Sequence, residues 1–336
     1  MLDLERMQSI QLSGDPLGQK AVASLLLIPN YSVPPRVRID VEAADRIPDE
    51  PVIFAMNHTD RYNYWPFMLR MWLDHSRFMA AWVKGKYYQN WWLGRFMEWT
   101  NNIPTVSRGY LIARDFKNVT GRDPTDSEYR LLRKLVDEVT VGTGDGEAGP
   151  EVRAGVPREI LQRPRDLLGV EFDPSERTWA RAVGELFLKM TDRFVTLNGE
   201  AFQKGLDLLV FPQGTRSKRL SRGRIGISQV ALHFDRTIVP VGCNGSDDVY
   251  PGSSPWGRSG HITYRVGEPI SPKQMEPFQT PEKFLPFTPE SESTYRDEFQ
   301  GLVDLVMERI NGLLEPQYQF SDDYDPDGVE GTARFI

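Results

Sequence analysis

Short apolar runs alternate with helix-like segments along the middle of this 336-residue chain. Residues 52–56 and 206–211 are mostly apolar and have the length of strands that are buried in a sheet. Residues 225–234 have helical character, and residues 237–243 form another apolar run of strand length. Strands that alternate with helices favour an α/β fold, and we predict a central mixed, mostly parallel sheet flanked by helices.

The same patterns predict further elements on both sides of this region. Strands are expected at residues 77–83, 103–107 and 261–266, and helices at residues 66–73, 87–99, 125–140, 176–202 and 294–314. A glycine-rich run at residues 142–146 marks a loop within the long stretch between residues 108 and 211. We therefore predict an N-terminal segment (1–50), an α/β domain (51–275) with a largely helical insertion at about 110–175, and a C-terminal helix with an acidic tail (276–336).

Composition limits the classes of protein to which the chain can belong. A hydrophobic fraction of 40% is enough for a sizeable core, and the net charge of −7 makes nucleic acid a poor partner. The single cysteine, Cys243, excludes an intramolecular disulfide and fits a reducing compartment. The apolar run 21–28 ends at Pro29 and is shorter than the about 20 residues that a bilayer span needs. We expect no transmembrane helix, so that any work on lipids takes place at the membrane surface.

The first segment with chemical potential is Asn57-His58-Thr59-Asp60-Arg61-Tyr62-Asn63, directly after the strand at 52–56. A histidine at the end of such a strand lies at the rim of the sheet, where α/β proteins bind ligands. Its imidazole titrates near neutrality and can accept a proton from a hydroxyl group. A catalytic imidazole needs a second residue that fixes its tautomer, and Asn63 and Asp60 are the candidates in this segment.

The second segment is Phe211-Pro212-Gln213-Gly214-Thr215-Arg216-Ser217, directly after the strand at 206–211. Gly214 allows a tight backbone turn, and Arg216 offers a planar fork of donors that suits phosphate. Thr215 and Ser217 add hydroxyl and backbone donors. This segment predicts a site for an anionic substrate.

In this order, the two segments resemble those of the glycerolipid acyltransferases, which acylate glycerol phosphate and lysophosphatidic acid. The family's first motif is His-x-x-x-x-Asp, and this chain has Asn63 where the family has the aspartate. The family's Phe-Pro-Glu-Gly-Thr-Arg-Ser motif is matched except at Gln213, which replaces a glutamate. The resemblance covers about residues 50–270 without the insertion, and it implies that His58 is the general base and that the segment Gly214 to Ser217 binds phosphate.

Two weaker blocks extend the resemblance. The run Asn102-Ile103-Pro104-Thr105-Val106-Ser107-Arg108 resembles the family's second motif, whose arginine binds the phosphate of the acceptor, and this implies the role for Arg108. Lys84 and Lys86 precede it in a stretch that resembles the family's lysine-rich segment, which implies that they also bind phosphate. The apolar run 237–241 resembles the fourth motif and implies an acyl or acceptor site that is lined by Val239, Pro240 and Gln213.

The resemblance implies an O-acyltransferase of phospholipid biosynthesis, similar to the 1-acylglycerol-3-phosphate acyltransferases. Such an enzyme moves a fatty acyl group from acyl-CoA or acyl-ACP, the co-substrate, to a hydroxyl of a glycerophosphate lipid such as lysophosphatidic acid. Transfer is direct, within a ternary complex, with no acyl-enzyme, no bound cofactor and no metal. The implied location is cytoplasmic and peripheral on the inner face of the cell membrane, with the membrane surface, the lipid substrate and acyl carrier protein as partners and no nucleic acid.

Asn63 and Gln213 keep other functions open, because both remove a negative charge from the site. An asparagine accepts a hydrogen bond but does not balance a charged imidazole, and the corresponding change in a serine protease, a worked example of this effect, lowers the rate about 10⁴-fold. Asp60 can take over the orienting role, or the protein can be a catalytically silent lipid-binding relative. The long insertion keeps a third function open, an acyltransferase that acts on a non-glycerolipid acceptor.

Two further clusters of side chains each have two interpretations. Six tryptophans are concentrated in one region, and they suit either core packing or the headgroup layer of a membrane: Trp65, Trp72, Trp82, Trp91, Trp92 and Trp99. Four basic residues follow the second segment, and they are either a solvated run or a part of the phosphate or coenzyme A site: Lys218, Arg219, Arg222 and Arg224.

Overall fold

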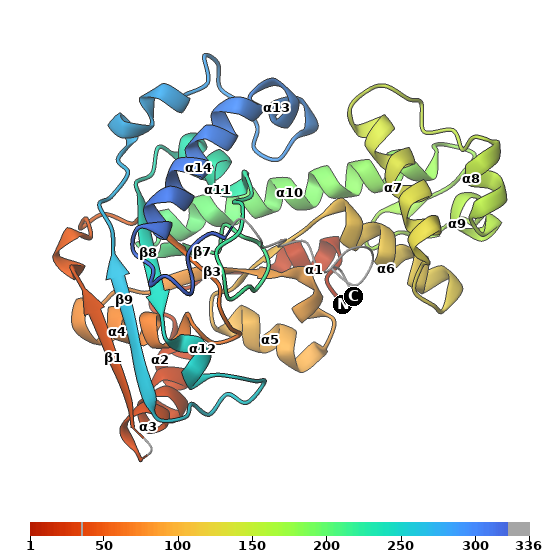
Figure 1. Ribbon diagram of the computed structural model, residues 1–336. Coiled ribbons are helices and arrows are strands. Elements are labelled where there is room, and N and C mark those ends of the chain that lie inside the picture. The colour runs from red at the N-terminus through yellow and green to blue at the C-terminus, as the bar shows by residue number, and fades with distance from the viewer. Residues whose placement is uncertain (35, 322–336) are drawn as a thin grey trace.

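A seven-stranded sheet forms the centre of the computed structural model, which describes residues 1–34 and 36–321 (Figure 1). In spatial order its strands are β1 (Val37–Glu42), β9 (Gly260–Val266), β8 (Ile238–Asn244), β2 (Ile53–Met56), β7 (Asp207–Val210), β3 (Met79–Lys84) and β4 (Ile103–Thr105). The five strands from β8 to β4 are parallel to one another, whereas β9 is antiparallel to β8 and parallel to β1. The predicted mixed, mostly parallel sheet of an α/β fold is confirmed.

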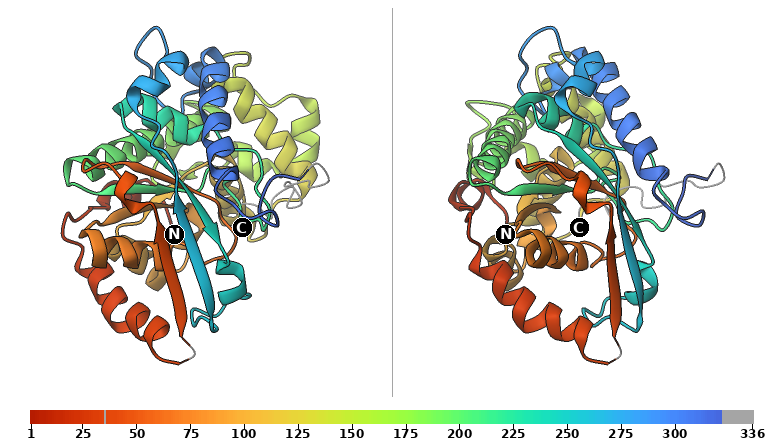
Figure 2. Two further views of the ribbon diagram at one scale, coloured as in Figure 1. Left: turned by 60° about the vertical axis from the view of Figure 1, so that its left-hand side comes forward. Right: turned by 90° about the vertical axis from the view of Figure 1, so that its left-hand side faces the viewer.

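Helices cover both faces of the sheet (Figures 1 and 2). One face carries the long helix α10 (Trp179–Gln203) together with α11 (Gly226–Phe234) and α14 (Arg296–Asn311). The other face carries α4 (Trp65–His75) and the N-terminal elements α2 (Leu17–Val22), η1 (Ala23–Leu27, a π-helical turn) and α3 (Ile28–Ser32). Shorter elements complete the frame: η2 (Ala44–Arg46), η3 (Gly85–Tyr88), α5 (Trp91–Trp99) and α12 (Ser246–Val249).

Strand β2 lies in the middle of the sheet and is buried on both faces. Ile53 and Ala55 contribute to the core beneath α10, α11 and α14, whereas Phe54 and Met56 contribute to the core beneath α4. Side chains alternate along a strand, so that a strand covered on both faces needs apolar residues at every position. This requirement explains the unbroken apolar run in the sequence and places His58, two residues past the end of β2, near the centre of the molecule.

Residues between β4 and β7 are largely helical, and they include the range of about 110–175 that was predicted to be an insertion. It contains α6 (Arg108–Thr120), α7 (Asp126–Thr140), α8 (Pro150–Gly155), α9 (Arg158–Gln162) and the small hairpin of β5 (Arg165–Asp166) and β6 (Glu171–Phe172). A buried ion pair between Arg165 and Asp115, whose carboxylate also accepts a bond from Trp179 Nε1 at 2.8 Å, ties α6, the hairpin and α10 together. Side chains of α7 pack in the same core as those of β2, so that the insertion is continuous with the α/β domain.

The predicted boundary at residue 50 falls inside the sheet-forming part of the chain. The first fifty residues contain α1 (Leu4–Ser9), the helices α2 and α3, and the edge strand β1, which pairs with β9 over six residues. β1 has only one fully buried residue, Val37, and its other positions are partly or fully exposed. Its sequence therefore lacks the apolar pattern on which the prediction of the other strands rested.

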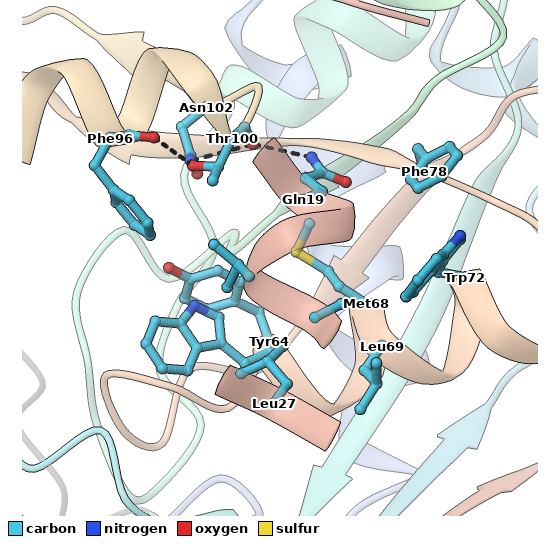
Figure 3. Close-up of a pocket in the computed structure, with 13 residues that line it drawn as sticks. Gln19, Leu27, Tyr64, Met68, Leu69, Trp72, Phe78, Phe96, Thr100 and Asn102 are labelled. Carbon is cyan, nitrogen blue, oxygen red and sulfur yellow. Dashed lines mark hydrogen bonds between the residues drawn. The ribbon is translucent and has the colours of Figure 1, made fainter. Parts of the chain in front are cut away.

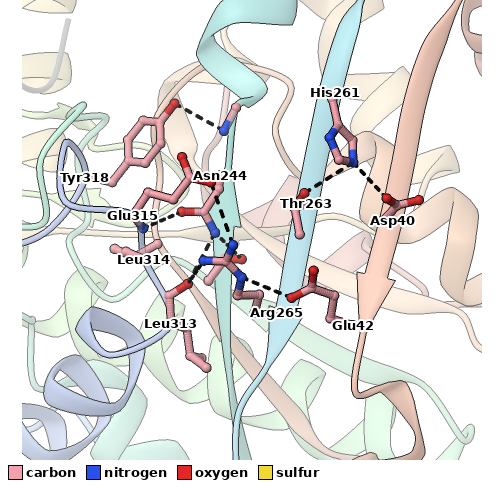
Figure 4. Close-up of polar contacts among 12 residues, drawn as sticks. Asp40, Glu42, Asn244, His261, Thr263, Arg265, Leu313, Leu314, Glu315 and Tyr318 are labelled. Atoms are coloured by element: carbon pink, nitrogen blue, oxygen red, sulfur yellow. Dashed lines mark hydrogen bonds and ion pairs between the residues drawn. The ribbon is translucent and has the colours of Figure 1, made fainter.

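The C-terminal region is also built onto the sheet. It contains η4 (Pro272–Phe278), α13 (Pro289–Thr294) and α14, and α14 packs against β8 and β2. The chain after α14 docks on β8 and β9. Asn244 of β8 accepts a bond from the backbone of Glu315 at 2.8 Å, and Arg265 of β9 donates to the carbonyl of Leu313 at 3.2 Å (Figure 4). The predicted acidic tail lies mostly outside the described residues.

Polar pairs join the edge strand β1 to its neighbour β9 on their exposed face (Figure 4). His261 lies 2.8 Å from Asp40, and Arg265 lies 3.0 Å from Glu42. These pairs hold β9 and β1 together where there is little apolar burial.

None of the helices within residues 1–34 and 36–321 has both the length and the apolar character that crossing a bilayer requires.

One buried ion pair anchors three strand ends, and its removal tests the packing of the sheet. Asp207 is 1% exposed, contacts Arg77 through both oxygens at 2.6 and 2.8 Å, and accepts a bond from the backbone of Val52. We expect Asp207→Ala to lower the free energy of unfolding by about 3–5 kcal/mol, because it leaves the half-buried guanidinium of Arg77 with backbone carbonyls alone and the buried N–H of Val52 without its acceptor. Chemical denaturation measures this change.

The exposed pair Arg70–Asp74 on α4 is the matched control. Asp74→Ala removes one partner of an ion pair that water already screens, and it should change the free energy of unfolding by about 0–1 kcal/mol. Equal effects of the two substitutions would contradict the anchoring role of Asp207.

Candidate active site

Four parallel strands end at one edge of the sheet, and a cavity of about 430 Å³ lies there. His58 follows β2, the turn at Gly214 follows β7, Lys84 ends β3 and Thr105 ends β4, and all four residues line the cavity. The carboxyl ends of parallel strands are the usual ligand site of α/β proteins, and the volume is within the range of small-molecule sites.

The two segments singled out in the sequence are in direct contact. The backbone N–H of His58 donates to Gln213 Oε1 at 2.9 Å, and the backbone N–H of Ser217 donates to the carbonyl of His58 at 2.8 Å. The ring of Phe211 stacks on the imidazole, with centroids 4.1 Å apart and an angle of 18° between the planes. The second segment therefore holds the backbone of His58 on both sides and one face of its ring.

Asn63 sets the orientation of the imidazole. Its Oδ1 lies 3.1 Å from His58 Nδ1, and its Nδ2 donates to the carbonyl of Asn57 at 2.8 Å. Because the amide nitrogen has an acceptor, the amide oxygen faces the ring, and this oxygen can only accept. Nδ1 of His58 therefore carries the proton and Nε2 keeps its lone pair, which is the tautomer that a general base requires.

Asp60, the alternative orienting residue, turns away from the imidazole. Its carboxylate accepts bonds from the backbone of Tyr62 at 2.8 Å and from the hydroxyl of Thr59 at 3.0 Å. Burial raises the pKa of Asp60 above its ordinary value, and the hydrogen bonds that it accepts oppose this shift. Asp60 stabilises the turn after β2, and the prediction that it can replace Asn63 is wrong for this arrangement.

His58 is a neutral imidazole over the whole physiological range. Burial lowers its pKa from 6.5 to about 3, the bond with Asn63 opposes the shift, and the nearby charges of Arg216 and Lys84 add to it. A depressed pKa means that the neutral form, with Nε2 free to accept a proton, persists until the pH falls to about 3.

Five cationic side chains line the cavity, and no aspartate or glutamate is among the described residues that do so. They are Arg61, Lys84, Lys86, Arg216 and Arg224. Burial and the charges of Arg216 and Arg61 lower the pKa of Lys86, as expected where like charges lie close together. Such a concentration of positive charge in a cleft attracts anions.

A second cavity, of about 330 Å³, continues the first between β3, β4 and the turn at Gly214. Lys84, Lys86 and Arg224 border both cavities, and Ser107 and Thr215 contribute hydroxyl groups to the second. Gly214 has φ +70°, a conformation that favours glycine and keeps this turn tight. These residues together can hold a phosphate group.

Arg108 does not reach this anion site. Its guanidinium pairs with Asp137 of α7 at 2.9 Å, lies over the ring of Phe187 and is 15% exposed. Arg108 therefore joins α6 to the rest of the insertion and does not line either cavity. The phosphate-binding role that the resemblance implied for Arg108 is therefore wrong for this arrangement. Arg61 lines the first cavity and Arg224 borders both cavities, although neither motif assigned phosphate binding to them.

Four other predicted residues are structural. Val239 and Pro240 are buried in the middle of β8, where they pair with β2 and do not line the cavity beside His58. Ser217 is buried, and its hydroxyl donates to the carbonyl of Arg219 at 2.5 Å. Gln213 likewise acts through its bonds, since its Nε2 donates to Arg219 and Ser221 while its Oε1 holds His58.

Aromatic side chains form another part of the cavity lining, here called the aromatic wall. Tyr64, Trp65, Trp82, Tyr87 and Phe96 line the cavity beside His58. Three of them, Tyr64, Trp65 and Phe96, also border a neighbouring apolar cavity with about 50 Å³ of free space, which lies between η1, α4 and α5 (Figure 3).

The lining of this neighbouring cavity comes from segments that are far apart in the chain. Leu27 of η1 faces Met68 and Leu69 of α4, and Gln19 of α2 closes one end by donating to the carbonyl of Thr100 at 2.9 Å (Figure 3). No motif marks these residues in the sequence. The only signal is their apolar character, which is shared with the rest of the core.

Comparisons with known proteins do not assign this chain to a family. No protein-family model matches the chain, and no curated protein matches it. Among solved structures, the 1-acyl-sn-glycerophosphate (LPA) acyltransferase PlsC from Thermotoga maritima is similar at 13% sequence identity and a TM-score of 0.37, over 91% of this chain and 77% of that one. A likeness at this level does not define a function, which has to be inferred from the site itself.

The ionisation of His58 can be measured directly. We expect nitrogen-edited NMR to show a neutral imidazole with its proton on Nδ1 at every pH from 8 to 5, because its pKa is about 3. His58→Ala removes the signal and so assigns it. A titration centred near the ordinary value of 6.5, or a proton on Nε2, would contradict the geometry of the Asn63 contact.

Proposed function

We propose that this protein is an O-acyltransferase that moves a fatty acyl group from an acyl thioester to a hydroxyl of a phosphate-bearing glycerolipid. The observation that supports this function best is that His58 lines one cavity together with two kinds of side chain. The five cations, here called the cationic wall, suit the phosphate of the acceptor, and the aromatic wall suits an acyl chain. The site thus combines a base, an anion site and an apolar surface.

The proposed reaction uses His58 as a general base. Nε2 takes the proton from the acceptor hydroxyl while the hydroxyl oxygen attacks the thioester carbonyl. The tetrahedral intermediate collapses, the carbon–sulfur bond breaks, and the imidazolium returns its proton to the leaving thiolate. The products are the acylated acceptor and the free thiol of coenzyme A or of acyl carrier protein, and no acyl-enzyme forms.

The low pKa of His58 makes it a weak base in the empty site, and an anionic substrate would counteract this. Arg216 and Lys84 both lower the pKa of His58, and both line the cavity in which the phosphate is proposed to bind. A phosphate group between them offsets their charge and raises the pKa of the imidazole. The acceptor would therefore strengthen the base that deprotonates it.

The acyl chain is proposed to lie along the aromatic wall. Trp82, Phe96 and Met97 provide apolar surface within the 430 Å³ cavity, and Tyr64 and Trp65 lead to the apolar cavity behind them. This assignment replaces the predicted acyl site at Val239 and Pro240, which lie inside the sheet.

A lipid-binding protein without catalytic activity is the second candidate, and one observation favours it. Asn63 accepts from the imidazole and from Tyr264 and donates to Asn57 and to the sulfur of Met56. None of these contacts supplies the negative charge that would stabilise an imidazolium. A binding protein needs the cationic and aromatic walls but no stronger base.

Replacement of His58 separates the two candidates. With lysophosphatidic acid and acyl-CoA as substrates, and acyl-ACP as the alternative donor, we expect His58→Ala to lower the turnover number about 10²–10⁴-fold, because the general base is lost. Binding of lysophosphatidic acid should persist, since the cations remain. His75→Ala, at the exposed end of α4, is the control. A wild-type protein that binds the lipid but forms no product with either donor would contradict the acyltransferase function and support the catalytically silent lipid-binding protein.

Lys86 and Arg108 test where the phosphate binds. We expect Lys86→Gln to raise the KM for a phosphorylated acceptor about 10–100-fold, which corresponds to the loss of one charge-assisted hydrogen bond, and to spare a neutral acceptor. Arg108→Gln should leave the ratio of the two KM values unchanged, because Arg108 lies in the insertion. Steady-state kinetics with paired acceptors gives both values, and the opposite pattern would restore the role that the sequence implied for Arg108.

A further inference from the structure

The predicted tryptophan cluster divides into two groups with different surroundings. Trp65 and Trp82 line the cavity beside His58, and Trp65 and Trp72 line the neighbouring apolar cavity. The three tryptophans of α5 lie on the surface. Trp91 is 58% exposed, Trp92 is 77% exposed and Trp99 is 53% exposed. Core packing explains the first group but not the second.

We propose that the α5 surface, defined as Trp91, Trp92, Arg95 and Trp99, docks on a lipid bilayer with anionic headgroups. The proposal deepens the proposed function, on which it rests for the delivery of a lipid substrate. Trp92, Arg95 and Trp99 are separated by three and four residues and so share one face of the helix. The rings of Trp91 and Trp92 are in contact, with centroids 4.5 Å apart.

The apolar surface extends onto the neighbouring helix. α2 packs closely against α5, since a Cβ atom on Gly18 would collide with the carbonyl of Trp99. Leu17, which directly precedes Gly18 in α2, is 70% exposed. Exposed apolar side chains that adjoin one another usually mark an interaction site.

The chemistry of the α5 surface favours a bilayer over a second protein chain. Tryptophan is the side chain most typical of the membrane–water interface, where its ring lies at the level of the headgroups. Arg95 lies between Trp92 and Trp99 and pairs with Glu98 at 3.0 Å through one nitrogen, but its side chain is 65% exposed. Its other guanidinium donors can reach headgroup phosphates while its stem stays among the apolar groups. A two-fold contact between copies of this chain would instead bring the same surface, with its guanidinium, against itself.

The α5 surface is continuous with the candidate active site. Leu93, Phe96 and Met97 lie on the other side of the same helix and line the cavity beside His58. Leu93 is 37% exposed and follows Trp92 directly, so that it borders both the cavity and the surface. A lipid that leaves the bilayer at α5 would enter the cavity along this helix, towards Arg61 and Lys86.

Sedimentation with vesicles tests this docking without any need for turnover. We expect the wild-type protein to bind vesicles of phosphatidylcholine with phosphatidylglycerol more tightly than vesicles of phosphatidylcholine alone. The double variant Trp92→Ser/Trp99→Ser should bind about tenfold more weakly or worse. Leu285→Ser is the matched control, since Leu285 is 70% exposed and belongs to the segment between η4 and α13. This segment leads into α13 at the top of Figure 1, whereas α5 lies in the lower half.

Kinetics and oligomeric state complete the test. The double variant should keep the turnover of a monomeric short-chain acceptor and lose turnover of the same headgroup embedded in vesicles, because neither tryptophan lines the cavity. Unchanged vesicle binding by the double variant would overturn the proposal. So would a wild-type protein that ignores vesicles but forms a dimer that the double variant abolishes, since this surface would then bind a second copy. His58→Ala should bind vesicles normally, so that loss of the proposed catalysis and loss of docking are distinguished.

Discussion

Two hydrogen bonds at the backbone of His58 hold the candidate site together. One runs from its N–H to Gln213 Oε1 and the other from the N–H of Ser217 to its carbonyl. They join the turns that follow β2 and β7, which are neighbouring parallel strands in the centre of the sheet. Because both turns are fixed to each other as well as to their strands, the imidazole cannot move away from the cations of the second segment. The position of the imidazole relative to these cations depends on this connection, whereas Asn63 sets its tautomer.

The side-chain amides of Asn63 and Gln213 each use both their oxygen and their nitrogen. Asn63 accepts from the imidazole and donates to the carbonyl of Asn57, and Gln213 accepts from His58 and donates to the carbonyl of Arg219 and the hydroxyl of Ser221. A carboxylate at either position would face a carbonyl oxygen without a proton to share. The site is therefore built for neutral side chains at these two positions. The charges of Arg216 and Lys84, which lower the pKa of His58, connect this low pKa with the proposed binding of a phosphate.

Central strands and amphipathic helices such as α10 were predictable, whereas the edge strand β1 and helix α6 were not. β2, β7 and β8 begin and end within one or two residues of their predicted limits, because a central strand needs apolar residues at every position. β1 has no such run, since it lies at the edge of the sheet and only Val37 is fully buried. Helix α6 was not predicted, although seven of its residues are buried, because its partners α7 and α10 come later in the chain.

The sequence by itself determined the α/β fold class and the two segments that meet at the edge of the sheet, because local periodicity and strand-end motifs are written in consecutive residues. Only the tertiary structure decided which charges face the cavity. Arg108 is adjacent to a site residue in the sequence, yet its helix turns it towards Asp137, whereas Arg224 and Arg61 reach the cavity through turns of the chain. The direction of a side chain depends on what packs against its element, and that information comes from residues that are distant in the sequence. The separation of buried from exposed tryptophans has the same cause.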